Sequence, residues 1–201
     1  MRRKSAKSEN VVGENPQNEQ HIVLESDRLR FATWAPGDWE DFRKLASDPL
    51  VVRYISAGGE PWSDERVKEF VARQRENWEK KGICLWKLLP KDSTELIGIC
   101  GLQHLPEGPD VEIGWWLAPS RWGQGLATEA AYRALTYGFD VCNVERIVAV
   151  AQAMNLDSLR VMERIGMRFE REAVHKGLHV VLYAISRNHF AELRGEKERR
   201  A

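Results

Sequence analysis

Hydrophobic and polar residues follow two different spacings along the chain, one typical of strands and one typical of helices. Short apolar or alternating runs predict strands within residues 21–34, 83–89, 95–105, 110–117, 146–152, 167–173 and 179–186. A helical spacing occurs over residues 39–47, 64–82, 126–137 and 155–166. Strands that first follow one another and later alternate with helices predict an α/β (α+β) fold, with a mixed sheet and helices on its faces.

Polar residues and glycines mark the expected ends of these helices. A side-chain oxygen just before a helix can accept a hydrogen bond from a free N–H group of the first turn. Such N-cap positions are held by Asp38, Ser63 and Asn155. Glycine readily takes the left-handed conformation that closes a helix, so helices are expected to end at Gly82, Gly138 and Gly166.

The two ends of the chain lack this patterning. Residues 1–20 are polar and without periodicity, which predicts a flexible N-terminal tail. Residues 193–201 are similarly polar and predict a C-terminal tail. Since no linker divides the part between them, we expect a single domain over residues 21–192, which is long enough for a complete hydrophobic core.

Composition excludes several classes of protein. The 30 Lys and Arg residues balance 30 Asp and Glu residues, so nothing favours direct nucleic-acid binding. No run approaches the ~18 apolar residues of a membrane span, and no apolar segment follows the basic start as in a signal peptide. We therefore expect a cytoplasmic protein without a membrane partner.

Three cysteines stand in or beside apolar runs, at Cys84, Cys100 and Cys142. They form no CxxC pair, so neither a disulfide framework nor a thiolate zinc site is expected. They are interpreted as small buried hydrophobic residues. No metal is expected elsewhere in the chain.

The stretch RWGQGLA, residues 121–127, joins a predicted strand to a predicted helix. Gly123 and Gly125 can adopt positive φ, and neither has a Cβ that would hold an anion away from the backbone. The free N–H groups and the dipole of a helix start suit a phosphate. The same residues would also suit a tight turn packed against the sheet, and the stretch alone leaves both interpretations open.

Two common nucleotide motifs do not fit this stretch. A Walker loop, G-x-x-x-x-G-K-[ST], is absent from the sequence. In the Rossmann pattern G-x-G-x-x-G, Thr128 stands where the third glycine belongs. Glu145 lies at the distance of the ribose-binding acid but precedes its strand instead of ending it, which excludes this interpretation.

A longer comparison is more specific. The stretches VEIGWWLAPSRWGQGLATEA (111–130) and NLDSLRVMERIGMRFERE (155–172) resemble the GNAT acetyltransferase superfamily. LESDRLRFATWAPGDWEDF (24–42) looks like the first strand and helix of its ribosomal-protein N-terminal (alanine/serine) acetyltransferase branch. The resemblance covers about residues 22–190. It implies a mostly antiparallel sheet with helices on both faces, and acetyl-CoA as the co-substrate.

The resemblance also implies which residues hold acetyl-CoA. In the family, the pattern [QR]-x-x-G-x-[GA] binds the pyrophosphate through backbone amides, and it falls here on Trp122, Gly123, Gln124, Gly125, Leu126 and Ala127. Trp122 departs from the Gln or Arg of the superfamily, which binding through amides tolerates. The backbone of Leu117, at the end of the preceding strand, would hydrogen-bond the pantetheine arm.

Acetyl transfer to an amine needs a base that removes a proton from the attacking nitrogen. Glu112 is the candidate, because it lies on the strand before the loop, where family members place such a base. It shares a strand face with Gly114 and Trp116. An ordinary solvent-facing glutamate would fit the same pattern.

The departing thiolate needs a proton, which many GNAT enzymes supply from a tyrosine. By register from Gly166, this position is Met162, which cannot donate. The closer branch instead has an asparagine and a serine, matched by Asn155 and Ser158 on one helical face. The resemblance implies that Asn155 binds the pantetheine and Ser158 meets the sulfur; alternatively, both only cap the helix.

These features predict an N-acetyltransferase in which the amine attacks acetyl-CoA directly within a ternary complex. The preferred acceptor is a protein or peptide N-terminal α-amine, whose pKa of about 7.7 to 8.0 demands less of a base than the value of about 10.4 for Lys. The alternatives are a small-molecule amine (an amino acid, a polyamine or an antibiotic) and an acyl-CoA-binding module without turnover. Either a monomer or a homodimer is compatible with the sequence.

Overall fold

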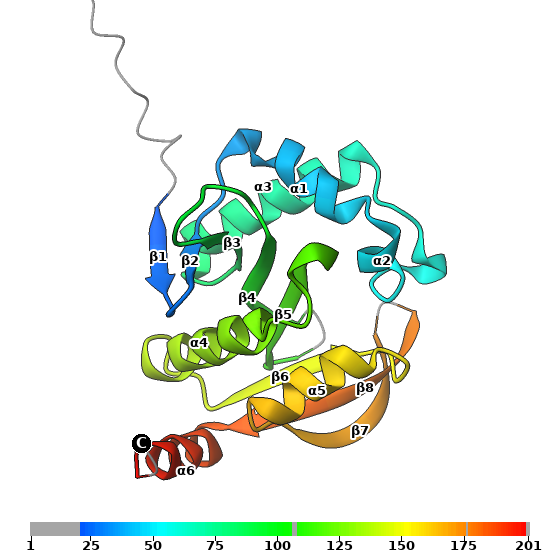
Figure 1. Ribbon diagram of the computed structural model, residues 1–201. Helices are drawn as coiled ribbons and strands as arrows, with labels where there is room; N and C mark the ends of the chain where they lie inside the picture. Colours follow the sequence, from blue (N-terminus) through cyan, green and yellow to red (C-terminus); the bar gives the residue numbers. More distant parts are fainter. Residues whose placement is uncertain (1–20, 106–107, 176, 200–201) are drawn as a thin grey trace, which may run out of the picture.

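Eight strands form one continuous sheet in the computed structural model, which describes residues 21–105, 108–175 and 177–199 (Figure 1). The strands are β1 (Ile22–Glu25), β2 (Leu29–Ala32), β3 (Leu85–Pro90), β4 (Gly98–His104), β5 (Val111–Leu117), β6 (Arg146–Ala151), β7 (Arg168–His175) and β8 (Leu178–Ser186). Their order is β1-β2-β3-β4-β5-β6-β8-β7. All neighbours are antiparallel except β5 and β6, which are parallel, so the expected mixed and mostly antiparallel sheet is confirmed.

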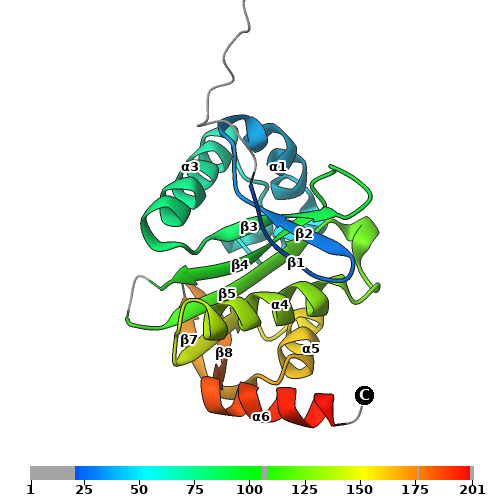
Figure 2. The same ribbon diagram turned by 90° about the vertical axis from the view of Figure 1, so that its left-hand side faces the viewer.

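Helices cover both faces of the sheet, as expected (Figure 2). They are α1 (Trp39–Ala46), α2 (Pro49–Val52), α3 (Asp64–Lys81), α4 (Leu126–Asp140), α5 (Leu156–Arg164) and α6 (Arg187–Glu198). Helices α1 and α3 lie over one face. Helix α4 packs against β4 and β5 on the other face, with α5 beside it. Among the described residues, no helix is long and apolar enough to span a membrane.

An aromatic cluster fills the space between α1, α3 and the sheet. The ring of Phe42 stacks on that of Phe70 with centroids 4.6 Å apart, and both rings stack on Trp116 of β5 at 5.7 and 6.0 Å. Trp62 contacts Trp116 edge-on at 4.9 Å. Because aromatic rings are large and rigid, this packing fixes the position of β5 relative to α3.

Most of the expected helix ends are confirmed. The Ser63 hydroxyl accepts a hydrogen bond from the Arg66 N–H at 3.3 Å, and Gly82 closes α3 with a φ of 66°. Gly166, just after α5, has a φ of 89°. The prediction that the Asp38 side chain caps α1 is wrong. Asp38 directly precedes this helix, but its carboxylate accepts a hydrogen bond of 2.6 Å from the Ala35 N–H instead. The reason is a short 3-10 turn, Pro36–Asp38, which leads into α1 and brings the Asp38 carboxylate next to the N–H group of Ala35, before the turn.

Gly138 does not end its helix, because α4 continues to Asp140. This glycine is buried where α4 crosses the sheet. A Cβ at this position would lie 2.7 Å from the Cδ1 atom of Ile147 and 2.8 Å from that of Leu102. The absence of a side chain therefore serves close helix–sheet packing, which a local sequence pattern does not distinguish from a helix stop.

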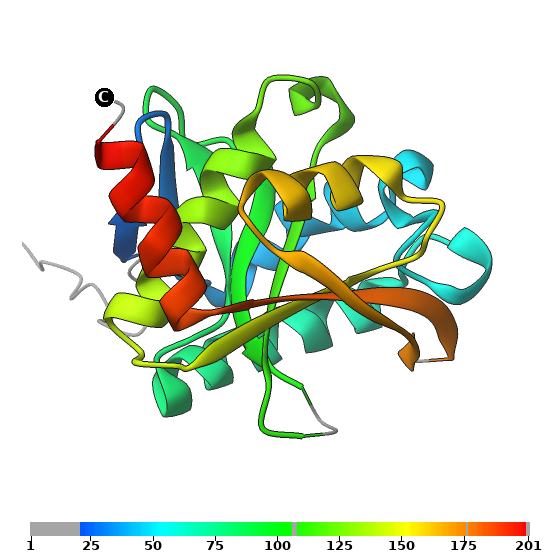
Figure 3. The same ribbon diagram turned by 90° about the horizontal axis from the view of Figure 1, so that it is seen from below.

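Residues 193–198, expected as the start of a polar tail, belong instead to helix α6. Phe190 anchors this helix: it is 1% exposed and packs on Phe139 and Tyr132 of α4. Arg194 adds an ion pair of 2.6 Å to Asp140. Figure 3 shows α6 beside α4, while the β7–β8 hairpin extends past α5. The tail expected at residues 1–20 lies outside the described residues.

Two of the three cysteines are buried in the core, as expected. Cys84 and Cys100 are fully buried and Cys142 is partly buried; all three are free thiols. Burial raises the pKa of the Cys84 and Cys100 thiols well above the usual value, so these groups remain uncharged. Cys84 and Cys100 therefore act as small hydrophobic residues of the core, while Cys142 packs at its margin.

Replacing Phe190 with alanine tests whether α6 is an integral part of the fold. We expect Phe190→Ala to lower the free energy of unfolding by about 3–5 kcal/mol, because a fully buried ring is removed. Phe169→Ala, at a site that is 55% exposed, should cost about 0.5 kcal/mol or less. Urea denaturation measures both values, and similar losses in the two variants would contradict a packed α6.

Candidate active site

A cavity opens where two neighbouring strands separate. Pairing between β5 and β6 stops after two residue pairs, the second of which joins Glu112 to Val148. β5 nevertheless continues to Leu117, and β6 continues to Ala151. The resulting cavity has a volume of about 770 Å³ and is lined by both strands, by α3 and by the starts of α4 and α5. This volume is typical of pockets that bind small molecules.

The edge of β5 beyond the last pair faces this cavity. The Ala118 N–H donates to Ile97 at 2.9 Å on the β4 side, and backbone groups alternate between the two edges of a strand. The backbone groups of Trp115 and Leu117 therefore point toward the gap. The Leu117 carbonyl accepts the Trp122 indole N–H at 2.8 Å. Among the described residues, the Leu117 N–H and the backbone groups of Trp115 have no partner across this gap, so they are available to a ligand.

The loop before α4 presents a row of backbone donors. Along residues 123–128, no N–H group donates to another group of the described chain. Gly123 and Gly125 have φ values of 72° and 75°, which explains why glycine stands at both positions. A Cβ at Gly123 would meet nothing within 4 Å, and one at Gly125 only Arg28 at 3.7 Å. The glycines are therefore not explained by packing against the sheet, and the free donors at the helix start suit an anion.

Glu129, in the first turn of α4, fastens this loop to the turn between β1 and β2. Its carboxylate accepts hydrogen bonds from the Ser26 hydroxyl at 2.7 Å, the Arg28 N–H at 2.8 Å and the Arg28 Nε at 2.6 Å. Burial raises the pKa of the Glu129 carboxyl, but these hydrogen bonds outweigh it and hold the pKa below its usual value. Arg28 also donates a hydrogen bond of 2.9 Å to the Gln124 carbonyl. The ion pair between Arg28 and Glu129 is therefore bonded directly to the loop.

Five of the six expected loop residues, 122, 123 and 125–127, line the cavity. Gln124 does not: its side-chain amide donates to the Ser120 carbonyl at 3.0 Å, away from the cavity. Only its backbone N–H remains in the row of free donors. The structure therefore brings the loop backbone and Leu117 to the same cavity, while the Gln124 side chain lies outside it.

Glu112 lies at the cavity wall and is only 6% exposed, unlike an ordinary surface glutamate. Its Oε2 accepts a hydrogen bond of 2.6 Å from the Gln103 amide, directly across the β4–β5 ladder. A buried carboxylate needs such a donor to offset lost hydration. Its Oε1 has no hydrogen-bond partner among the described residues, which leaves one carboxylate oxygen able to accept a proton from a bound group.

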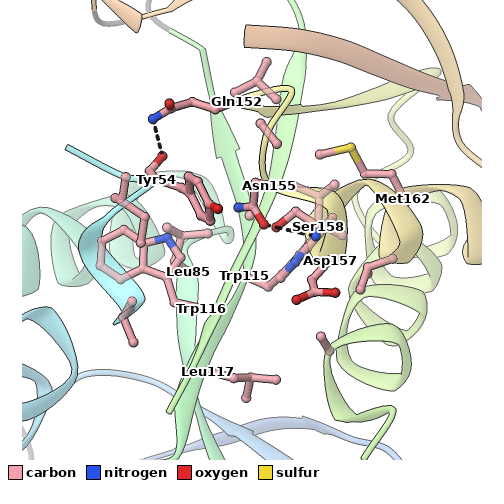
Figure 4. A pocket seen from close by; sticks show the side chains of 18 of the residues that line it. Tyr54, Leu85, Trp115, Trp116, Leu117, Gln152, Asn155, Asp157, Ser158 and Met162 are labelled. Atoms are coloured by element: carbon pink, nitrogen blue, oxygen red, sulfur yellow. Dashed lines mark hydrogen bonds between the residues drawn. The ribbon is translucent and has the colours of Figure 1, made fainter. Parts of the chain in front are cut away.

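Helix α5 supplies the opposite wall. Figure 4 shows Asn155, Asp157, Ser158 and Met162 on this side of β5, with Tyr54 and Trp116 on the other. Asn155 is the N-cap, as expected, and its Oδ1 accepts the Ser158 N–H at 3.3 Å. The Ser158 hydroxyl caps nothing and has no partner among the residues that the structure describes. It lines the cavity as a free donor, one helical turn before the buried Met162.

Several residues of the site carry no signal in the sequence. Gln103 becomes the partner of Glu112 only through the register of β4 and β5. The backbone carbonyl of Tyr54 accepts a hydrogen bond of 3.1 Å from the side-chain amide of Gln152 (Figure 4). This bond joins the two walls of the cavity, although the two residues are 98 positions apart in the sequence. Alternation along β4 would place the Gln103 side chain on one face, but it does not identify the glutamate opposite.

Comparisons with known proteins identify the family of this chain. The sequence profile described as "Acetyltransferase (GNAT) domain" matches residues 28–168. YnaD of Bacillus subtilis, described as an uncharacterized N-acetyltransferase, is 35% identical over 161 residues, covering 78% of this chain and 89% of YnaD. The spermidine N(1)-acetyltransferase of Escherichia coli K12 is 27% identical over 85 residues, 42% of this chain and 45% of that protein.

A solved structure shares the fold. The ribosomal L7/L12 alpha-N-protein acetyltransferase RimL, in complex with coenzyme A, superposes with a TM-score of 0.68 at 18% identity, covering 83% of this chain and 98% of that one. The profile spans more than half of this chain and includes β5, the loop and α5. The protein is therefore a member of the GNAT acetyltransferase family.

Proposed function

We propose that this protein transfers the acetyl group of acetyl-CoA to the α-amine of a peptide or protein N-terminus. GNAT enzymes use acetyl-CoA. The observation that carries the proposal is the row of free N–H groups along residues 123–128, which shares a cavity with the buried Glu112. The donors would hold the diphosphate of CoA, and the open edge of β5 at Trp115 and Leu117 would bind its pantetheine arm.

In the proposed reaction, the amine nitrogen forms a bond to the acetyl carbonyl carbon, and the bond from this carbon to the CoA sulfur breaks. The nitrogen attacks only after losing a proton, because the protonated amine has no free electron pair. Glu112 would accept this proton directly or through a water molecule. After the attack the nitrogen loses its second proton, and the free Ser158 hydroxyl would relay it by giving its own proton to the departing thiolate and taking up this one; Met162 has no proton to give.

The charge of the cavity favours a peptide over a polyamine. Its charged lining residues are six arginines and three carboxylates: Arg53, Arg66, Arg73, Arg121, Arg160 and Arg164, with Glu69, Glu112 and Asp157. A polyamine carries several positive charges, which such a lining repels. The pKa of an N-terminal α-amine lies close to physiological pH, so a fraction of the amine is already neutral and a single carboxylate base is sufficient. A small-molecule amine without further positive charge remains the alternative acceptor.

Changing Gly125 to valine tests the role of the loop. We expect Gly125→Val to bind CoA at least 100-fold more weakly, or not at all, because a branched side chain with positive φ distorts the donor row and fills the approach of the diphosphate. Gly82→Val is the matched control, since Gly82 has a similar φ of 66° at the end of α3, outside the cavity. Calorimetric titration with CoA measures the affinity; equal affinity in both folded variants would show that the loop is only a turn.

Replacing the carboxylate of Glu112 by an amide tests it as the base. We expect Glu112→Gln to lower kcat by roughly 10²- to 10⁴-fold with little change in the affinity for acetyl-CoA. The loss should decrease at high pH, where the amine is already neutral. Thiol release measured against pH gives the answer. Wild-type rates in the variant at pH 7 would exclude Glu112, and a wild-type protein without turnover on any amine would instead indicate a binding module.

A panel of amines tests the acceptor. Short peptides with a free, small N-terminal residue should show higher kcat/KM than spermidine or an aminoglycoside. The same peptides with a blocked N-terminus and one free lysine should react poorly, because their amine has a much higher pKa. If the blocked lysine peptide or the polyamine reacts best, the acceptor assignment fails while the acetyltransferase activity stands.

A further inference from the structure

The arginines that line the cavity fall into two groups. Arg121 and Arg160 are paired, with Glu95 at 2.7 Å and Asp157 at 2.9 Å. Arg66 and Arg73, both on α3, form no ion pair with any carboxylate of the described chain, and the same is true of Arg53 after α2 and Arg164 at the end of α5. These guanidinium groups are therefore available to an anion from outside the protein.

Aromatic rings of the cavity wall hold these unpaired groups in place. Arg66 lies 4.1 Å from the ring centroid of Trp62, and Arg73 lies 5.7 Å from that of Phe70. A guanidinium that contacts an aromatic ring keeps its N–H donors free for a carboxylate. Both rings contact Trp116 of β5, which is itself fixed in the aromatic cluster. The two arginines are thus attached to a rigid support, although their side chains are exposed.

The length of β5 between Trp116, against which the rings that hold these arginines pack, and Glu112 indicates the kind of acceptor. Trp116 and Glu112 lie on the same face of β5, four residues apart, which corresponds to about 13 Å along a strand. Arg66 reaches Trp116 through the ring of Trp62, and Arg73 reaches it through the ring of Phe70. A free amino acid carries its amine and carboxylate on one carbon and does not span this distance. An extended peptide of about four residues does, at up to about 3.5 Å per residue.

Resting on the proposed N-terminal acetyltransferase activity, we propose that Arg66 and Arg73 select acceptor peptides that carry acidic side chains within their first few residues. The two arginines are seven positions apart on α3, about 10 Å along its axis, so they are placed to meet carboxylates at separate peptide positions. A guanidinium binds a carboxylate through strong, charge-assisted hydrogen bonds. Glu69, between them on α3, is the one lining carboxylate of this helix and would disfavour binding at one point along the peptide.

Three peptides of equal length test the proposal on the intact protein: an N-terminal alanine followed by Asp and Glu, by Asn and Gln, or by Lys residues. We expect kcat/KM, measured by thiol release, to be about 10-fold higher for the acidic peptide than for the neutral one, and lowest for the lysine peptide. Salt should reduce the difference, since exposed charges are screened. Equal values for the three peptides would overturn the proposal.

Variants assign the effect to the two arginines. Arg66→Gln and Arg73→Gln should each lower kcat/KM for the acidic peptide toward that of the neutral peptide. Arg75→Gln is the matched control, because Arg75 lies on the same helix but does not line the cavity, and it should keep the wild-type preference. The double variant Arg66→Glu, Arg73→Glu should favour the lysine peptide, a gain that general damage to the fold would not produce.

The outcomes separate this proposal from the function on which it rests. Turnover of all three peptides at equal rates overturns the acidic preference and leaves the N-terminal acetyltransferase standing. Absence of turnover with any peptide overturns both. A preference for acidic peptides that persists in Arg66→Gln and Arg73→Gln, or that is lost equally in Arg75→Gln, would overturn the assignment to these two residues.

Discussion

The site depends on one interruption of the sheet, the separation of β5 from β6 after Glu112. A parallel pair that continued to the strand ends would bury the backbone groups of Trp115 and Leu117 in strand hydrogen bonds. Because the strands diverge, those groups face a cavity, and the first turns of α4 and α5 stand on its borders. The loop that carries the free donors and Glu112 both line the cavity at this divergence.

The packing on each face of the sheet keeps that cavity in shape. On one side, Trp116 is held between α1 and α3 by stacked rings, so the face of β5 that carries Glu112 is fixed. On the other side, the hydrogen bonds of Glu129 to Ser26 and Arg28 fasten the loop before α4 to the first hairpin. These contacts order the donors in advance, so that a ligand binds with little further loss of conformational entropy.

The cavity offers positive potential from two different sources. At the start of α4 it comes from backbone N–H groups and the helix dipole, which suit a compact phosphate group. Along α3 it comes from guanidinium groups on aromatic rings, which suit carboxylates spread along a chain. Glu112 lies on the strand between α3 and α4. This division of charge suits a co-substrate that carries a diphosphate and an acceptor peptide whose carboxylates lie away from its reacting amine.

The sequence by itself determined the order and type of the main elements, the caps at Ser63 and Asn155, the end of α3 at Gly82 and the glycine loop, because each depends on local spacing or on the conformation of one residue. It could not determine the role of Gly138 or the presence of helix α6, which follow from what packs against them. Only the tertiary structure joined Gln103 to Glu112, Gln152 to Tyr54 and Arg28 to Glu129. Two of these pairs are about a hundred residues apart, and no local periodicity records which distant side chain the fold will bring within hydrogen-bond reach.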